Sequence, residues 1–144
     1  MTFRDVVALW LVNEKTAHDV VLAACDLLVG DVDSHAVGRL AALSRGEADI
    51  EVPILLPEAL RELGLVAHAR GSVAAKEEGL RAMAVRVESG DLTPRELAAW
   101  AHRVFGHEHE GERLSELDDA YDIGVTSDTE VDAEVLAEAR RLTG

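Results

Sequence analysis

The chain has 144 residues, about the size of one domain, and its formal net charge of −14 comes from 28 acidic and 14 basic side chains. This excess of negative charge argues against binding to nucleic acid or to anionic lipid, because both require clustered lysine and arginine. Apolar residues form 48% of the chain but aromatic residues only 3%, so the core must consist mainly of leucine, valine and alanine. This composition favours an all-α protein whose helices pack closely on small side chains.

No stretch of the sequence reaches the roughly 18 consecutive apolar residues of a membrane span, and the first residues lack the pattern of a secretory signal. Cys25 is the only cysteine, so the monomer has no disulfide. Its apolar neighbours indicate a small buried side chain rather than a reactive thiol. We therefore expect a cytoplasmic protein that does not bind membranes.

Helix starts in the first part of the chain are marked by hydroxyl residues, each of which can accept a hydrogen bond from a free backbone N–H. Three helices are predicted, over residues 3–12, 17–29 and 35–43, beginning after Thr2, Thr16 and Ser34. Gly30 is expected to end the second of them in a left-handed conformation.

The region around the first two prolines is expected to be irregular. Pro53 lacks a backbone N–H and clashes with the preceding helical turn, so residues 45–52 are predicted to form a loop with a brief extended piece. A helix is predicted to start near Pro57, because proline is favoured in a first turn, and to end at Gly64. Residues 65–70 show no clear pattern.

The clearest helix start in the chain lies in the second half. Thr93, Pro94 and Glu96 follow one another as cap, first-turn proline and capping-box acid, and this helix is predicted to end at Phe105. Three further helices are predicted: from Ser72 to Gly90, from Gly111 to Tyr121, and from a capping box of Thr129 and Asp132 to Leu142.

A shift of 77 residues places the first half of the sequence on the second, with Thr16 on Thr93 and Leu40 on Leu117. Each half then contains a helix, a short turn, a capped helix, a loop and a helix. We predict a helical bundle of about seven or eight helices, arranged as two similar three-helix units. These are an N-terminal half of residues 1–70 and an acidic C-terminal half of residues 71–144, within one compact domain.

Negative charge is concentrated in the C-terminal half: residues 106–138 contain twelve acidic side chains and one basic side chain, Arg113. Such a surface attracts a basic protein, and an aromatic side chain among charges can anchor the interface. A solvated helix face, with Tyr121 packed in the core, is the alternative. The predicted partner is a basic protein, bound through Glu108, Glu110, Glu116, Asp118, Asp119, Tyr121 and Asp122.

Three histidines, His102, His107 and His109, precede the acidic pair Asp118 and Asp119. Imidazole and carboxylate groups suit zinc or iron, so a metal-binding helical protein is an alternative function. The histidines lack the paired helical spacing of common zinc motifs, and exposed loop histidines would give the same pattern. No phosphate-binding loop, dinucleotide fingerprint or serine-hydrolase motif is present, so we expect a non-catalytic protein without a cofactor, with metal-dependent hydrolysis as the remaining enzymatic alternative.

Residues 90–97 (GDLTPREL), the aromatic helix after them and the segment at 117–122 resemble the small helical immunity proteins of the colicin D type. The likeness covers about 50 residues of the chain. The resemblance implies that an acidic helical surface binds a basic toxin nuclease domain and occludes its active site. It therefore implies an immunity or antitoxin-like inhibitor, to which this chain adds an N-terminal half of similar size.

A helical adaptor or oligomeric scaffold is a further alternative. It would use exposed apolar patches around Leu55, Leu56 and Val66.

Overall fold

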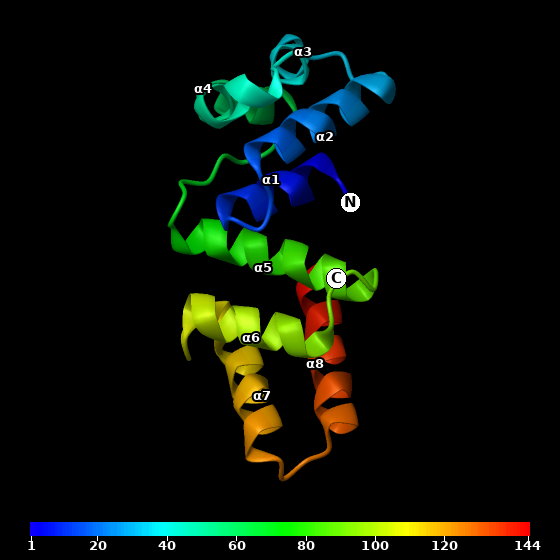
Figure 1. Ribbon diagram of the computed structural model, residues 1–144, viewed down its shortest axis with the longest axis vertical. Coiled ribbons are helices and arrows are strands. Elements are labelled where there is room, and N and C mark those ends of the chain that lie inside the picture. Colours follow the sequence, from blue (N-terminus) through cyan, green and yellow to red (C-terminus); the bar gives the residue numbers. More distant parts are fainter. The chain divides into compact units, whose positions relative to one another are not determined.

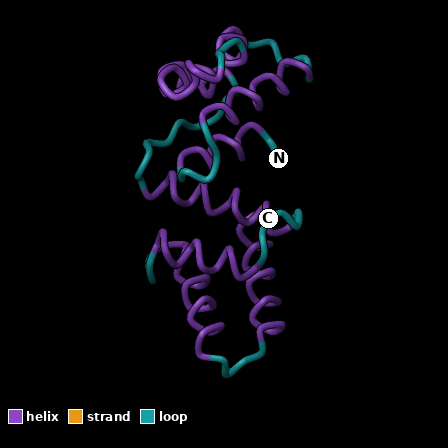
Figure 2. Tube along the Cα trace, in the orientation of Figure 1, coloured by secondary structure: helices purple, strands orange, loops and turns teal.

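The computed structural model describes all 144 residues and consists of helices and their connections, with no β-strand (Figure 1, Figure 2). The predicted all-α fold is confirmed. No helix combines the length and the apolar character that a membrane span requires. The elements are α1 (Phe3–Leu11), α2 (Ala17–Val29), α3 (His35–Ala41), α4 (Arg45–Glu62), α5 (Val73–Glu88), α6 (Pro94–Phe105), the 3₁₀ turn η1 (His109–Gly111), α7 (Glu112–Ile123) and α8 (Asp128–Thr143).

The chain forms two compact units, Met1–Ala75 and Lys76–Gly144. In unit 1, α2 contacts α1, α3 and α4, and α3 contacts α4. In unit 2, α6 contacts α7, α8 and η1, and α7 contacts α8. The second and third helices of each unit therefore pack together, and the fourth helix packs on both.

Small aliphatic side chains form the helix contacts of both units. Val20, Ala24 and Val37 are completely buried in unit 1, where they belong to one continuous apolar cluster. Ala101 and Leu114 are completely buried in unit 2. Small side chains allow the helix axes to approach closely, so a core with few aromatic residues can still fill its space.

The shift of 77 residues predicted from the sequence reappears in the backbone. The turn between the first two helices of each unit has a left-handed residue at the same place, Asn13 with φ 64° and Gly90 with φ 85°. Two hydrogen bonds of this turn also correspond. In unit 1, Asn13 N–H donates to Trp10 O at 3.1 Å and Glu14 N–H to Leu9 O at 2.8 Å. In unit 2, Gly90 N–H donates to Val87 O at 3.1 Å and Asp91 N–H to Arg86 O at 2.8 Å.

Each unit has a fourth helix beyond the three in the predicted repeat. Ser44 caps α4 in a reciprocal box with Glu47, and Ser127 caps α8 in the same box with Glu130. These caps are 83 residues apart, so unit 2 has six more residues than unit 1 before its fourth helix. Most of them lengthen the third helix, because α3 has 7 residues and α7 has 12.

The cap predicted for the last helix is wrong. Thr129 and Asp132 lie inside α8, whose first residue is Asp128. Ser127 has the extended backbone that an N-cap requires and accepts from the Glu130 N–H, so the nearer hydroxyl-acid pair begins the helix.

The loop predicted before Pro53 is also wrong, because α4 continues through Pro53 and Pro57. Both prolines lie on the exposed side of the helix, where the carbonyls that lose a donor can bind water. The buried side is apolar, with Ala48, Val52 and Leu56 at four-residue spacing. Burial of this stripe and the cap at its start outweigh the two lost hydrogen bonds.

Two predicted helix caps differ in detail. Gly30 has φ −81°, and the left-handed residue is Asp31, with φ 65°. The Val32 N–H donates to Leu27 O at 3.1 Å and closes the helix end around that residue. At α6, Thr93 accepts from the Glu96 N–H as expected, but the Glu96 carboxylate accepts from the Thr93 hydroxyl and not from the Thr93 backbone N–H, so the capping box is incomplete.

We expect Pro53→Ala to stabilise the protein by about 1–2 kcal/mol. Alanine restores a backbone donor inside α4, and this gain exceeds the entropy that proline removes from the unfolded chain. The measurement is urea unfolding followed by far-ultraviolet circular dichroism. Pro94→Ala is the matched control, because Pro94 is the first residue of α6 and removes no helical bond. Equal effects of the two substitutions would contradict a continuous α4.

Candidate functional site

The end of α6 and the loop after it position the histidines. One face of α6 is buried through Leu97, Ala101 and Phe105, and His102 lies beside that face with a half-buried side chain. Gly106 has φ 61°, in the region that favours glycine, and ends the helix. His107 follows at once, so its imidazole lies just beyond the C-terminus of α6.

A close contact fixes the start of α7. A Cβ atom added to Gly111 would lie 2.5 Å from Cβ of Phe105, so the Phe105 side chain packs directly on this backbone. Ser115, completely buried on α7, donates its hydroxyl hydrogen bond to Gly106 O. The 3₁₀ turn and the first turn of α7 are thereby held against the end of α6.

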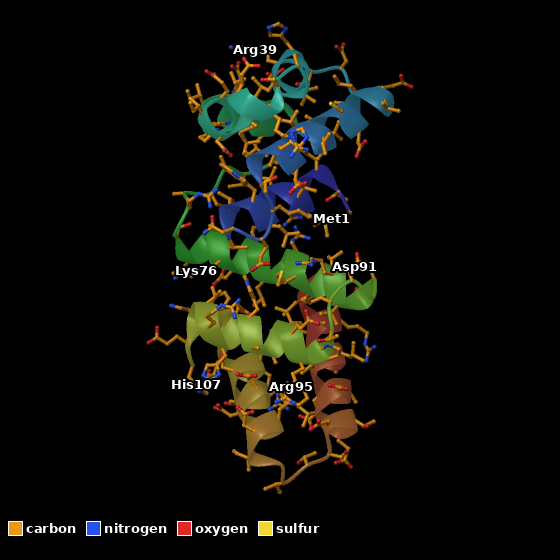
Figure 3. All side chains as sticks on the ribbon, in the orientation of Figure 1. Met1, Arg39, Lys76, Asp91, Arg95 and His107 are labelled. Atoms are coloured by element: carbon orange, nitrogen blue, oxygen red, sulfur yellow. The ribbon has the colours of Figure 1, made fainter.

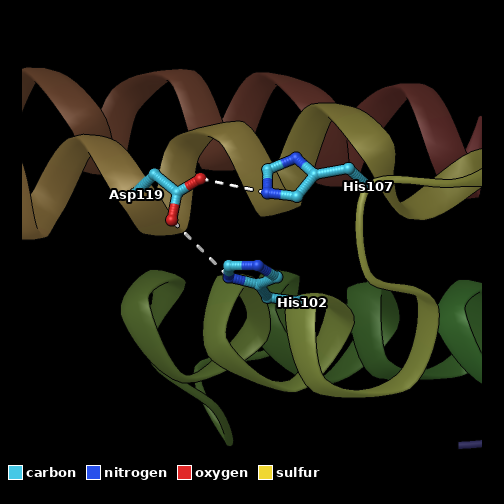
Figure 4. Close-up of side chains that lie close together, drawn as sticks. All are labelled: His102, His107 and Asp119. Atoms are coloured by element: carbon cyan, nitrogen blue, oxygen red, sulfur yellow. Dashed lines mark ion pairs between the residues drawn. The ribbon is translucent and has the colours of Figure 1, made fainter.

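These contacts bring two histidines and two aspartates together, and Figure 4 shows three of them, His102, His107 and Asp119. Nδ1 of His102 lies 2.9 Å from Oδ2 of Asp118 and 3.8 Å from Oδ1 of Asp119. Nε2 of His107 lies 3.1 Å from Oδ2 of Asp119. The two imidazole rings meet edge to face, with centroids 4.8 Å apart. We call these four residues the His–Asp cluster.

The third predicted metal ligand, His109, does not join the cluster. Its Nε2 lies 3.9 Å from a carboxylate oxygen of Glu108, and its backbone φ is 55°. One ligand atom from each of His102, His107 and Asp119 can be chosen so that all three lie within 4.8 Å of one another. The geometry therefore selects two of the three histidines and one carboxylate as a possible metal site.

Most of the predicted interface carboxylates form ion pairs within unit 2. Arg95, on α6, lies 3.4 Å from Asp122 and 3.9 Å from Asp128, and Figure 3 shows it on the same unit as His107. Arg113 pairs with Glu116 and Glu134, and Arg141 pairs with Glu110 and Glu138. The hydrogen bonds that the Arg141 guanidinium donates to Glu138 and Glu110 raise the pKa of Arg141. These pairs link α7 to α6 and α8, although each exposed pair contributes little stability.

Tyr121, predicted to anchor a partner, is only 6% exposed. Its hydroxyl donates to Asp132 on α8, and the Arg95 guanidinium lies 5.0 Å from the ring centroid. Burial raises the pKa of Tyr121, and the hydrogen bond to Asp132 raises it further. The packed alternative is correct, and Tyr121 is not available as a surface anchor.

Two exposed apolar side chains near the acidic residues were not predicted. Ile123, at the end of α7, is 69% exposed, and Val125, in the loop before α8, is 88% exposed. Asp122 and Asp128 flank them in sequence. The signal was present in the sequence, since Ile-Gly-Val interrupts an acidic segment at a turn where no helix face can bury it.

The apolar patch predicted for an adaptor does not form as expected. Leu56 is 3% exposed and belongs to the unit 1 core, because it follows Ala48 and Val52 on the buried face of α4. Leu55 is partly buried against the same core, and only Val66, at 72% exposed, lies on the surface.

No protein family model, no curated protein and no solved structure matches this chain.

We expect Gly111→Ala to destabilise the protein by about 1–3 kcal/mol, because the added methyl group overlaps the Phe105 side chain. Urea unfolding measures the change. Gly38→Ala is the matched control: Gly38 lies in α3 and has no neighbouring atom within 4 Å of an added Cβ, so alanine there should be neutral or stabilising by up to about 1 kcal/mol. A neutral Gly111→Ala would show that Phe105 does not pack on this backbone.

Tyr121 should ionise only above its ordinary pKa of 10 while the protein is folded. It is the only tyrosine, so tyrosinate absorbance reports on it alone. A raised folded-state pKa contributes stability that is complete below pH 10 and is lost as pH rises above it. Tyr121→Phe, which removes this dependence, should be less stable than the wild type at pH 7 by about 1 kcal/mol, and the difference should shrink in alkali. Ordinary titration near pH 10 before unfolding would contradict the burial.

Proposed function

We propose that this chain is a non-catalytic protein-binding module that binds a basic protein through the acidic surface of unit 2. The concrete form of the proposal is an immunity or antitoxin-like inhibitor of a basic effector, in line with the resemblance of the C-terminal half to colicin D-type immunity proteins. Such a protein would act in the cytoplasm. Nucleic acid is not the proposed partner, because the chain carries twice as many acidic as basic side chains.

The observation that supports this proposal most is the imbalance of charge around α7 and α8. Arg95, Arg113 and Arg141 pair with six of the twelve carboxylates of residues 106–138, and three positive charges leave most of the negative charge of that segment uncompensated. Uncompensated carboxylates on packed helices produce a fixed negative potential. This potential raises the association rate with a basic protein and rejects acidic competitors.

Ile123 and Val125 supply the apolar contact that charged side chains alone do not provide. Charged rims contribute mainly to the association rate and to specificity, whereas affinity depends on apolar residues that lose water on binding. Both side chains are exposed and lie between Asp122 and Asp128 in the chain. We assign them the anchoring role that the sequence suggested for Tyr121. The exposed carboxylates of Glu108, Glu110, Glu116 and Asp122 would form the rim.

The test is charge reversal at two exposed rim residues, Glu116→Lys with Asp122→Lys. We expect the Kd for a basic partner, captured with the wild-type chain at low salt, to rise by at least about tenfold and its salt dependence to become shallower. Titration calorimetry at two salt concentrations measures both. Unchanged affinity and unchanged salt dependence would rule out this surface.

Asp33→Lys with Asp49→Lys is the matched control. It changes the net charge by the same amount, but both residues are exposed in unit 1. Equal weakening by both double variants would show that net charge, and not the surface of unit 2, determines binding.

A further inference from the structure

The His–Asp cluster lies where the second and third helices of unit 2 meet. Unit 1 packs its own second and third helices together without such a cluster. The shift of 77 residues that aligns the caps and turns of the two units also aligns the cluster with unit 1. In unit 1 the same helix junction is made by Cys25, whose Sγ lies 3.5 Å from Ala41 O. The residues aligned with His102, His107, Asp118 and Asp119 are Cys25, Gly30, Ala41 and Ala42.

Small uncharged residues therefore suffice at this junction. Two imidazoles and two carboxylates at one junction have to be desolvated in part, and their contacts with one another join two helices that cysteine and alanine already hold together in unit 1. The contrast between two units built on the same plan indicates that the four polar groups are present for their chemistry.

That chemistry is divalent metal coordination. We propose that unit 2 binds one zinc ion through His102 Nδ1, His107 Nε2 and a carboxylate oxygen of Asp119. Tetrahedral zinc with bonds of about 2.0–2.1 Å places its ligand atoms about 3.3 Å apart. His107 Nε2 lies 3.1 Å from Oδ2 of Asp119, and His102 Nδ1 lies 3.8 Å from Oδ1 of the same carboxylate. One ligand atom from each residue can be chosen so that no two are more than 4.8 Å apart. Rotation of these side chains, which are 30% to 50% exposed, is enough to close the remaining difference.

Asp118 is a candidate fourth ligand. Its Oδ2 lies 2.9 Å from His102 Nδ1, the atom that would bind the ion, so Asp118 would have to exchange this contact for one with the metal. With two neutral imidazoles and two carboxylates, the complete site would carry no net charge. Nitrogen and carboxylate ligands without a thiolate suit zinc and its neighbours in the transition series, whereas magnesium and calcium prefer oxygen ligands alone.

The ion would join three separate segments of unit 2. His102 belongs to α6, His107 to the loop and Asp119 to α7. Because an ion that binds only the folded state stabilises that state, zinc should fasten α7 to α6 and raise the melting temperature. This role goes beyond the proposed protein binding and needs no protein partner.

The test is titration calorimetry of the untagged full chain with zinc chloride, together with thermal melts in zinc and in chelator. We expect one zinc ion per chain, a higher melting temperature with zinc, and no comparable effect of magnesium. Cobalt(II) should give visible absorption bands of a four-coordinate site. Absence of zinc binding at micromolar protein would overturn the proposal.

His107→Asn and Asp119→Asn should each weaken zinc binding by at least about tenfold, since each removes a ligand. Their controls are His109→Asn and Asp122→Asn, which make the same changes at a histidine and an aspartate outside the cluster and should leave the zinc Kd unchanged. Circular dichroism in chelator checks that every variant is folded. Equal weakening by the variants and their controls would also overturn the proposal, because it would mean that zinc binds at scattered surface groups.

Discussion

The structure depends on side-chain hydroxyls that begin its helices. A serine or threonine accepts a hydrogen bond from a free N–H at the start of six helices: α1, α2, α3, α4, α6 and α8. Ser72 accepts in the same way from the Ala75 N–H in the first turn of α5. With so few aromatic residues, each helix has a modest apolar stripe, and its register must be correct for that stripe to be buried. The caps set that register.

Helix α7 is the exception, and it carries most of the residues of interest. Gly111, the residue before α7, makes no side-chain cap, and the position of the helix depends on the contact with Phe105 and on the Ser115 hydroxyl. Tertiary contacts here replace the local signal that begins the other helices. The same contacts hold the loop between α6 and α7, so His107 has a defined position beside α7.

Local signals in the sequence were sufficient for the fold class and for most helix starts. The hydroxyl-acid pairs at Thr2, Thr16 and Thr93 mark real helix starts. The sequence misled at α4, where the tendency of Pro53 to break helices was overcome by burial of the opposite face. Whether proline lies on the wet side of a helix is a property of tertiary structure, so a local pattern could not reveal it.

The sequence predicted the residue types of the candidate site, but it did not predict which histidines and carboxylates come together there. The sequence indicated histidines and carboxylates after residue 100, yet His107 and His109, two positions apart, point to different partners. The left-handed backbone of Gly106 and of His109 decides this, and such conformations in a loop are set by the contacts around it. The sequence also could not decide whether Tyr121 lies at an interface or in the core, because an amphipathic ring suits both.

The longer third helix of unit 2 has a consequence for how the chain could gain or lose function. Aligned with α3, the additional residues of α7 begin at Asp119 and end at Ile123. Shortening α7 to the length of α3 would thus remove a cluster carboxylate and an exposed apolar side chain in one step. It would leave untouched the buried Leu114 and Leu117, which fulfil the roles of Val37 and Leu40 in unit 1. The same stretch contains Tyr121, which is buried and hydrogen-bonded to Asp132 on α8. The residues that lengthen α7 therefore serve packing against α8 as well as the exposed surface, and a deletion there would affect both.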